Sequence, residues 1–428
     1  MTPLDKLNFF RRCTRQNLYV PPFTFGRVEN IHSLSSLQKI WNEATAEVTN
    51  VKAETSLYIH VPFCHRRRCT FCMYNSSVDY THEVLSAYRD NIKLTFKSWE
   101  NNLPSEFRNF YVGGGTPSVY SAQELHRFLF PFTRLKFVEK GERTCEMSPT
   151  TATEEHIKAI ADCGFNRLSL GIQSFDTSVL DAINREHVEF EYVCKLCSCA
   201  RRVGLIDINL DLMLGIPRLT RGNIKDSVRK VISSGAISAS IYYWRQTPVP
   251  REELITQFHI VQEEMLNHGW RLESGSDQSE HHLFFSPESR NDTLRYVTSP
   301  NCVDNQRVIG LGLYANGFRP SLAYSCRSDN QYKIWRMDTN RQLHMAAANM
   351  LYYCEGRINK KRFKEILGAE VCEVFARELD ELRSIGGVEE TQSEINILGK
   401  SGFESNALQK FFWDFGWLEE WSRRNGGS

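Results

Sequence analysis

Short apolar segments alternate with longer segments of helical periodicity between residues 56 and 250. In residues 83–99, for example, large apolar side chains recur three or four positions apart, which predicts an amphipathic helix. The apolar segments between such helices are short and end in glycine or polar residues, which is typical of buried strands. The strands predicted in this way are 56–61, 109–115, 143–148, 166–173, 208–217 and 238–244, and the helices are 83–99, 122–132, 153–164, 189–204 and 223–235.

This alternation predicts, for residues 56–250, an α/β fold with a parallel sheet. In such a fold the carboxyl ends of the strands meet at one edge, where we expect the active residues. The alternation of strands and helices is weaker before residue 56 and after residue 250. We expect an N-terminal arm over residues 1–55, an irregular extension that shapes a substrate pocket over residues 251–335, and a small helical, winged-helix-like domain over residues 336–428.

The composition is that of an ordinary globular protein and argues against several classes of function. The 428 residues include 52 lysines and arginines against 51 aspartates and glutamates, so no global charge favours nucleic acid or an anionic membrane. No apolar run reaches the roughly 18 residues of a membrane span, and the N-terminus lacks the apolar core of a secretory signal. We therefore expect a cytoplasmic protein that acts on a small molecule.

Three of the 13 cysteines stand close together in the chain. Cys64, Cys69 and Cys72 have the spacing C-x4-C-x2-C and directly follow the predicted strand 56–61. The odd number of cysteines and the absence of a signal sequence argue against a disulfide framework. The triplet suits an iron–sulfur cluster, whose ligands are cysteine thiolates. A zinc site completed by His60 or His65 is the alternative.

The sequence around the triplet, YIHVPFC followed by CTFC, resembles the cluster loop of the radical S-adenosylmethionine (SAM) superfamily. It is most similar to the branch that contains oxygen-independent coproporphyrinogen III oxidases, their haem-chaperone relatives and the class C radical methyltransferases. Further motifs of this branch follow in order: YVGGGTPS (111–118), CEMSPTTAT (145–153), RLSLGIQSF (167–175), NREH (184–187) and INLDLMLGIP (208–217). The resemblance implies a partial (β/α)6 TIM-like barrel that binds a [4Fe–4S] cluster and, in this branch, two molecules of SAM.

The resemblance also implies roles for individual residues. Cys64, Cys69 and Cys72 would each bind one iron of the cluster. Arg185 suits the carboxylate of SAM, because a guanidinium pairs with it bidentately, and Asp211 suits the ribose hydroxyls as an acceptor. The full set that matches contacts to the cofactor is Tyr58, Phe71, Gly114, Gly115, Thr116, Glu146, Gln173, Arg185, Asp211 and Met213. Of these, Phe71, Gly115, Gln173 and Met213 match positions near the second SAM molecule.

Two departures from the family pattern bear on this prediction. The family spacing is C-x3-C-x2-C, so the HRRR segment is one residue longer here. A flexible loop absorbs one residue at little cost, and we still expect a cluster. Coproporphyrinogen oxidases typically have a further cysteine two residues after the triplet, where this chain has Tyr74. That difference argues against porphyrin synthesis, and the 55 leading residues argue against the chaperone relatives, which lack a comparable arm.

The expected function is reductive cleavage of SAM to a 5′-deoxyadenosyl radical, with an external one-electron donor of flavodoxin or ferredoxin type. The favoured outcome is methylation or cyclopropanation of a specialised small molecule with two molecules of SAM. The alternatives are other radical chemistry, such as decarboxylation, dehydrogenation or sulfur insertion with an auxiliary cluster, and haem trafficking. Cys194, Cys197 and Cys199 could hold an auxiliary cluster, although cysteine is also a common buried residue and core packing is favoured.

Overall fold

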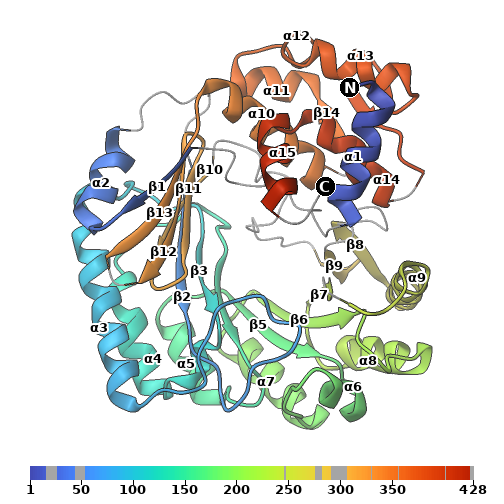
Figure 1. Ribbon diagram of the computed structural model, residues 1–428. Helices are drawn as coiled ribbons and strands as arrows, with labels where there is room; N and C mark the ends of the chain where they lie inside the picture. Colours follow the sequence, from blue (N-terminus) through green and yellow to red (C-terminus); the bar gives the residue numbers. More distant parts are fainter. Residues whose placement is uncertain are drawn as a thin grey trace.

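The computed structural model describes residues 1–15, 27–43, 54–244, 247–274, 282–290, 306–328, 330–354, 356–400 and 402–424. Its largest element is a single curved sheet with helices along the outer face (Figure 1). A second unit of helices and a three-stranded sheet lies beside it. The described helices include none with the length and apolar character that crossing a bilayer requires.

Six consecutive strands in the middle of the large sheet are parallel, as the alternating pattern predicts. They are β2 (Glu54–Val61), β3 (Phe110–Gly114), β4 (Arg143–Met147), β5 (Arg167–Gln173), β6 (Asp207–Leu214) and β7 (Ser238–Tyr243). The helices that follow them are α3 (His82–Ser98), α4 (Ala122–Leu129), α5 (Glu154–Asp162), α6 (Thr177–Ala182), α7 (Phe190–Arg202) and α8 (Arg221–Ser233). The predicted (β/α)6 arrangement with a parallel sheet is confirmed.

The two faces of these strands have different chemistry. In β2, Leu57, Ile59 and Val61 are fully buried in the core beneath the helices. Because successive side chains of a strand point to opposite faces, Tyr58 and His60 point to the concave side of the sheet. The concave side therefore receives the polar and aromatic residues of the motifs, and the convex side forms the core.

Side-chain caps fix where the helices begin. Thr81, Ser121, Thr153, Asp176 and Thr220 each accept a hydrogen bond from a backbone N–H in the first turn of α3, α4, α5, α6 and α8. Such caps satisfy N–H groups that have no partner inside the helix. Each capped helix follows the carboxyl end of a strand, so the caps also define the loops that form the candidate site.

Residues 251–335 are far more regular than expected, and the prediction of an irregular extension is wrong for the part that the structure describes. This region forms α9 (Arg251–Asn267), β8 (Trp270–Ser274), β9 (His282–Pro287), β10 (Gln306–Leu311), β11 (Asn316–Arg319), β12 (Leu322–Ser328) and β13 (Gln331–Arg336). β9 and β8 extend the sheet beyond β7, and β10 lies parallel to β2 at the other end. The strands were missed because they are short and half exposed; in β13, for example, the inward Tyr332 and Ile334 alternate with polar residues.

The N-terminal residues are divided between the two units instead of forming one arm. Helix α1 (Pro3–Arg15) packs on the C-terminal unit, where Phe9 and Phe10 are buried. Strand β1 (Arg27–Ile31) pairs with β13 at the edge of the large sheet, and α2 (Leu34–Glu43) packs on the same core. Leu37, Ile40 and Trp41 of α2, three and four positions apart in the sequence, are the residues that it buries, and residues 44–53 lie outside the described part.

The C-terminal unit combines helices with a small antiparallel sheet, which is the winged-helix-like composition that was expected. Its helices are α10 (Thr339–Tyr353), α11 (Lys360–Leu367), α12 (Val371–Val374), α13 (Ala376–Ser384), α14 (Gly402–Gln409) and α15 (Phe415–Arg424). Its strands are β14 (Arg357–Asn359), β15 (Val388–Glu390) and β16 (Glu394–Ile397), with β16 in the middle. Short 3₁₀ turns occupy Glu100–Asn102, Pro117–Val119, Phe130–Phe132 and Lys410–Phe412.

Candidate functional site

The three clustered cysteines lie on one loop at the carboxyl end of β2. The backbone N–H of Cys64 donates to the carbonyl of Ser77 at 2.8 Å, and that of Cys72 donates to the carbonyl of Cys69 at 3.2 Å. The N–H of Thr70 donates to the carbonyl of Ile183 at 3.0 Å, which ties the loop to the segment after α6. All three thiols are free and partly exposed. The predicted ligands are therefore held on an anchored loop at the edge where chemistry is expected.

The additional residue of this loop is taken up at Arg66. Arg66 has a φ of 52°, a left-handed conformation that is uncommon for residues other than glycine. Around it the N–H of Arg67 donates to the carbonyl of His65 at 2.6 Å, which closes a tight three-residue turn. This turn therefore accommodates the longer spacing between Cys64 and Cys69.

The surroundings of the thiols bear on which metal they can bind. Burial raises the pKa of the Cys72 thiol, and the neighbouring Cys64 and Cys69 raise it further. Within the described residues, no three His, Cys, Asp or Glu side chains are close enough together to hold one metal ion. Thiolates that share one zinc ion converge on a single point, whereas the ligands of a cubane each bind a different iron. The positions of the thiols therefore do not select between the two kinds of site.

Arg185 connects the cysteine loop to the end of β5. Its Nη1 donates to the sulfur of Cys69 at 3.2 Å, and its Nη2 donates to the carbonyl of Gly171. A Cβ atom on Gly171 would lie 3.0 Å from Arg185 Nη2 and 3.0 Å from Gln173 Nε2, so a larger residue would crowd both groups. The structure therefore brings together three residues from the predicted set, Cys69, Arg185 and Gln173.

Gln173 is the residue that most directly suggests a ligand. It ends β5 with a φ of 72°, beside a shift in register between β5 and β6, and only 9% of it is exposed. Its side-chain Oε1 is buried and has no hydrogen-bond partner among the described residues. A buried acceptor without a partner is costly, and a residue held in a strained conformation is typical of functional sites. A donor from a bound ligand would satisfy it.

The glycine-rich segment after β3 packs against the strand that leads to the cysteines. The N–H of Gly115 donates to the carbonyl of Val61 at 2.7 Å, and the N–H of Thr116 donates to that of Phe63 at 2.6 Å. Gly114 has a φ of 107°, and a Cβ atom there would collide with the ring of His60. The segment needs glycine for this close packing. Since the N–H groups of Gly115 and Thr116 are engaged, a ligand contact by them must use oxygen atoms.

Two carboxylates, Glu146 on β4 and Asp211 on β6, lie on the concave side. Tyr111 Oη donates to Glu146 Oε1 at 2.5 Å, and the N–H of Gly114 donates to Oε2 at 3.2 Å. Asn209 Nδ2 donates to Asp211 Oδ1 at 2.5 Å. Burial raises the pKa of Glu146. Burial, and then the charge of Glu146, raises the pKa of Asp211 to about 7. Both groups can accept hydrogen bonds from a polar ligand, and Asp211 can hold a proton near neutral pH.

Tyr58 and His60 form a hydrogen-bonded pair on β2. Burial lowers the pKa of His60, which favours the neutral ring. With the ring neutral, Nε2–H donates to the carbonyl of Asn75 at 3.2 Å and Nδ1 accepts from Tyr58 Oη at 2.9 Å. Both ring nitrogens are engaged, so His60 positions Tyr58 and the loop instead of binding a metal. The ring of Tyr74 lies 6.3 Å from that of His60.

The remaining predicted residues lie nearby with less specific surroundings. Phe71 is partly buried and packs against the core below the cysteine loop. Met213 is buried near the end of β6 and is 7% exposed. Both positions fit core packing, so their contact with a cofactor stays a prediction. Thr116 is likewise buried, next to the glycine segment.

The sequence analysis missed a polar network on the same face. Arg167 on β5 contacts Asp207 through Nε at 3.1 Å and Glu142 through Nη1 at 3.4 Å. Arg290 lies 3.6 Å from Asp207. The signal was present: polar residues alternate with apolar ones in RLSLGIQ and DINLDLM, which indicates strands with one polar face. The network lies at the amino ends of these strands, on the same polar face as the candidate site.

The contacts of the cysteines on α7 bear on the predicted auxiliary cluster. On α7, Cys199 donates to the carbonyl of Glu154, with Sγ and O 3.8 Å apart. Cys197 is fully buried, and burial raises the pKa of its thiol to about 12. These contacts fit core packing, the reading that was favoured. Cys302 lies outside the described residues.

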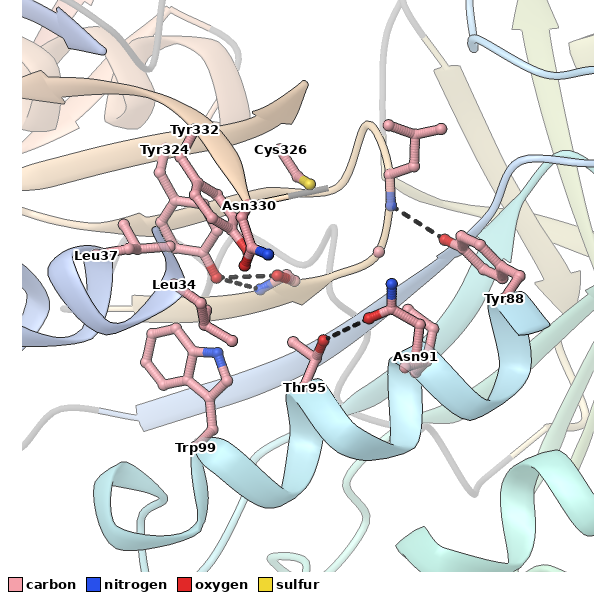
Figure 2. A pocket seen from close by; sticks show the side chains of 14 residues that line it. Leu34, Leu37, Tyr88, Asn91, Thr95, Trp99, Tyr324, Cys326, Asn330 and Tyr332 are labelled. Carbon is pink, nitrogen blue, oxygen red and sulfur yellow. Dashed lines mark hydrogen bonds between the residues drawn. The ribbon is translucent and has the colours of Figure 1, made fainter. Parts of the chain in front are cut away.

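A crevice lies between α2, α3 and the strands β10, β12 and β13 (Figure 2). None of the predicted site residues lines it, but one of its tyrosines bonds to β2. Tyr88 Oη donates to the carbonyl of His60 at 2.6 Å and accepts from the N–H of Leu313 at 3.1 Å. Tyr88 therefore holds β2, α3 and the turn after β10 together directly before the cysteine loop.

Comparison with known proteins relates the parallel strands of the large sheet to one family. Residues 58–231 match the family model described as the Radical SAM superfamily. The chain is 34% identical to the heme chaperone HemW of Lactococcus lactis subsp. lactis (strain IL1403) over 188 residues, 44% of this chain and 48% of that protein. It is 32% identical to the oxygen-independent coproporphyrinogen III oxidase of Helicobacter pylori (strain J99 / ATCC 700824) over 203 residues, 45% and 43% of the two chains.

The fold is shared over a longer stretch. The structure of coproporphyrinogen III oxidase (HemN) from Escherichia coli matches with a TM-score of 0.72 at 18% identity, over 87% of this chain and 93% of that one. The chain spans about half the length of the curated relatives it matches. Over residues 58–231 the chain is thus similar to radical SAM proteins, and the coproporphyrinogen III oxidases are among the relatives that it resembles there.

Proposed function

We propose that this protein is a radical SAM enzyme that binds a [4Fe–4S] cluster and SAM at the carboxyl ends of β2–β6, and that it acts on a tetrapyrrole. The observation that carries the cofactor part is the buried Oε1 of Gln173, which has no partner among the described residues and lies on the strand that Arg185 connects to Cys69. A donor from a bound molecule would satisfy this acceptor.

The residues fit the cofactors by their chemistry. Cys64, Cys69 and Cys72 would bind three irons and leave the fourth open for SAM. When bound, the cluster and SAM supply a one-electron cleavage of the sulfonium bond, which yields methionine and a 5′-deoxyadenosyl radical. The residues that would bind SAM are Tyr58, Phe71, Gly114, Gly115, Thr116, Glu146, Gln173, Arg185, Asp211 and Met213. A second SAM molecule beside Phe71, Gly115, Gln173 and Met213 is part of this proposal.

The chain itself positions and protects the reactants. Arg185 keeps its guanidinium between the cysteine loop and β5, where a carboxylate can pair with its remaining N–H groups. Asp211, with its pKa raised to about 7, can accept from hydroxyl groups as a carboxylate or hold a proton. Glu146 is already bonded to Tyr111 and Gly114, which orients it toward the concave side. Such preorganised groups orient a reaction without large rearrangement.

The relatives guide the choice of substrate. Their names refer to coproporphyrinogen oxidation and to a heme chaperone, and this supports a tetrapyrrole better than the methyl acceptor that the sequence analysis favoured. Methyl transfer and cyclopropanation become the less supported outcome. We place the reaction among oxidative decarboxylations or dehydrogenations of a porphyrinogen.

A haem chaperone is the second candidate, and one specific observation favours it. Tyr74 stands where coproporphyrinogen oxidases typically have a further cysteine. Tyr74 is 60% exposed, and its ring lies 6.3 Å from that of His60. A protein of this kind would bind haem and release little or no 5′-deoxyadenosine.

One anaerobic experiment separates these candidates. The chain is reconstituted with iron and sulfide, and SAM, a strong reductant and either coproporphyrinogen III or haem are added. About four irons per chain, release of 5′-deoxyadenosine and its loss in Cys64→Ala would support the enzyme; Cys372→Ala, a partly exposed cysteine on α12, is the matched control. A haem absorbance shift without nucleoside release would support the chaperone. S-adenosylhomocysteine as the main product would make methyl transfer the best supported reaction.

A further inference from the structure

Asn209 joins Asp211 to a buried network of polar side chains on β5, β6 and β7. It precedes Asp211 by two positions on β6 and is fully buried. Because residues two apart on a strand share a face, Asn209 lies beside Asp211 on the concave side, toward the amino end of the strand. Its Nδ2 donates to Asp211 Oδ1 at 2.5 Å and to Ser169 Oγ at 3.0 Å. The motifs did not match Asn209 to any contact with the cofactor, so its role has to come from these bonds.

Serines of β7 hold the Asn209 amide in one orientation. Ser240 Oγ donates to Asn209 Oδ1 at 3.0 Å. Ser238 Oγ lies 3.2 Å from the same oxygen, but a hydroxyl has one proton to donate, and that of Ser238 goes to Asp207 Oδ1 at 2.6 Å. The oxygen of the Asn209 amide therefore faces β7, and its N–H groups face β5 and the carboxyl group of the candidate site.

This network gives the two oxygens of Asp211 different surroundings. Oδ1 accepts the short bond from Asn209 Nδ2. Within the described residues, the hydroxyl of Ser169 is the one donor near Oδ2, and it is shared, since it lies 3.3 Å from each of the two oxygens. An oxygen that already accepts from an amide N–H is a poor place for a proton, so a proton on this carboxyl group belongs on Oδ2. Oδ2 is also the oxygen with more capacity to accept from a ligand.

The titratable groups around Asp211 act on its proton in opposite directions. Burial, and then the carboxyl group of Glu146 on β4, raises the pKa of Asp211 to about 7, against the opposing charge of Arg167 on β5. Tyr242 on β7 interacts with the same carboxyl group: burial, and then the charge of Asp211, raises the pKa of the phenol. The bond from Asn209 lowers the pKa of Asp211, because a donor favours the ionised form. Asn209 thus opposes the effect of burial without adding a charge.

We propose that Asn209 is a positioning residue for Asp211: its amide engages Oδ1 and leaves Oδ2 to accept from the two neighbouring hydroxyl groups of a ribose. The inference rests on the proposed function, because SAM is the ligand that carries this ribose. To accept from both hydroxyl groups, Oδ2 has to be ionised. A ligand that binds below neutral pH therefore displaces the proton of Oδ2, which passes to water, and binding is linked to pH.

The test measures nucleoside binding by the full chain without a cluster. Adenosine and 2′,3′-dideoxyadenosine are the probes, because they differ only in the two hydroxyl groups and neither titrates between pH 5.5 and 8. Titration calorimetry in two buffers of different ionisation enthalpy gives the affinity and the number of protons released.

The variants separate positioning from stability. Asn209→Ala removes the amide, and Ser240→Ala keeps the amide but removes the donor that orients it. Asn166→Ala is the matched control. Asn166 is also buried and makes two bonds at the amino end of β5, to the carbonyl of Gly141 at 2.9 Å and from the N–H of Arg143 at 2.8 Å.

We expect the wild type to bind adenosine at least about tenfold more tightly at pH 8 than at pH 5.5, and to release close to one proton at pH 5.5. Asn209→Ala should bind adenosine at least about tenfold more weakly at pH 7, with the midpoint of its pH profile moved upward, and should bind dideoxyadenosine within about threefold of the wild type. Ser240→Ala should change both in the same direction by less. Asn166→Ala should keep the wild-type profile.

Two results would overturn the proposal. One is a wild type that binds adenosine no better than dideoxyadenosine, and the other is a pH profile that is the same in the wild type and in Asn209→Ala. If Asn209→Ala does not fold, an unchanged profile in Ser240→Ala has the same meaning. A wild type that shows pH-linked adenosine binding but cleaves no SAM after reconstitution would refute the proposed function and leave the role of Asn209 valid.

Discussion

Arg185 donates a hydrogen bond to the sulfur of Cys69 across 3.2 Å, although 116 positions separate the two residues in the chain. A second bond from the same guanidinium reaches the carbonyl of Gly171. The cysteine loop after β2 is thus fastened to the end of β5, three strands away in the sheet. A site assembled from several strand ends needs such cross-connections, because each loop alone is free to move relative to the others.

Replacing Arg185 should weaken cofactor binding more than it weakens the fold. Arg185→Ala removes two charge-assisted donors, each worth about 1.5–3 kcal/mol, and we expect SAM affinity of the reconstituted protein to fall by at least about tenfold. Equilibrium dialysis with labelled SAM measures this. Arg202→Ala is the control: Arg202 is 60% exposed on α7 and pairs with Glu154 on the outer face. Equal losses in both variants would contradict a specific role of Arg185.

Replacing Gln173 should raise the stability of the cofactor-free protein and lower its affinity for SAM. Gln173→Leu removes a buried oxygen that lacks a partner, so we expect the cofactor-free protein to be stabilised by up to about 1–3 kcal/mol. The same change should abolish measurable SAM binding. Gln257→Leu is the matched control, since buried Gln257 accepts from the N–H of Gly215 at 2.9 Å and its loss should destabilise. Thermal melts with and without SAM give both readouts. Destabilisation by Gln173→Leu would show that its oxygen has a partner within the protein.

The hydrophobic pattern of the sequence predicts the parallel strands in the middle of the sheet but not the strands toward its edges. The strand expected at 166–173 is β5, Arg167–Gln173, because its alternating apolar face is a local signal. β10 could not be predicted in this way, since it pairs with β2 and places Gln306 opposite Glu54, roughly 250 positions earlier. Pairing over such separations depends on the tertiary fold, which periodicity does not encode.

Of the candidate site, likewise, the sequence predicts the residues but not their contacts. The motifs of Cys64 and Asp211 include strands β2 and β6, and strand ends share one edge of the sheet. Arg185 follows helix α6, and only the NREH motif indicated it. The contact between Arg185 and Cys69, and the strained turn at Arg66, depend on how two loops meet in space. His60 shows the limit most clearly: the sequence left it open as a zinc ligand, and only its bonds to Tyr58 and Asn75 identify it as a positioning residue.

Asp211 should make stability depend on pH. Its pKa is raised from 3.8 to about 7 by burial and by Glu146, so the folded state binds more protons than the unfolded state between these values. Stability from this group is therefore fully present below about pH 4 and is lost as pH rises toward 7. Asp211→Asn stays neutral throughout. We expect the melting temperature of the variant, relative to the wild type, to be higher at pH 8 than at pH 5.5. A difference that does not change with pH would mean that Asp211 is ionised across this range.

The turn at Arg66 predicts a contrast between two substitutions that remove the same charge. Arg66→Gly suits a φ of 52° and should retain about four irons per chain after reconstitution. Arg66→Val places a β-branched residue in the left-handed region, which costs about 1–2 kcal/mol or more in a tight turn. We expect lower iron content or slower cluster assembly in the valine variant. Iron and sulfide assays after identical reconstitution provide the comparison, and equal loss in both variants would point to the charge of Arg66 instead.

The first helix of the chain should stabilise the last helices. Phe10 on α1 is 2% exposed and its ring lies 4.9 Å from that of Phe411, while Lys6 and Glu381 join α1 to α13. Phe10→Ala should therefore cost about 3–5 kcal/mol in the C-terminal unit. We expect faster amide hydrogen exchange in peptides of α13 and α14, and unchanged exchange in β4–β6. Leu4→Ala, at a position that is 56% exposed on the same helix, is the control. If β4–β6 exchange faster as well, the two units unfold together, and the N-terminal helix stabilises the catalytic sheet through the C-terminal unit.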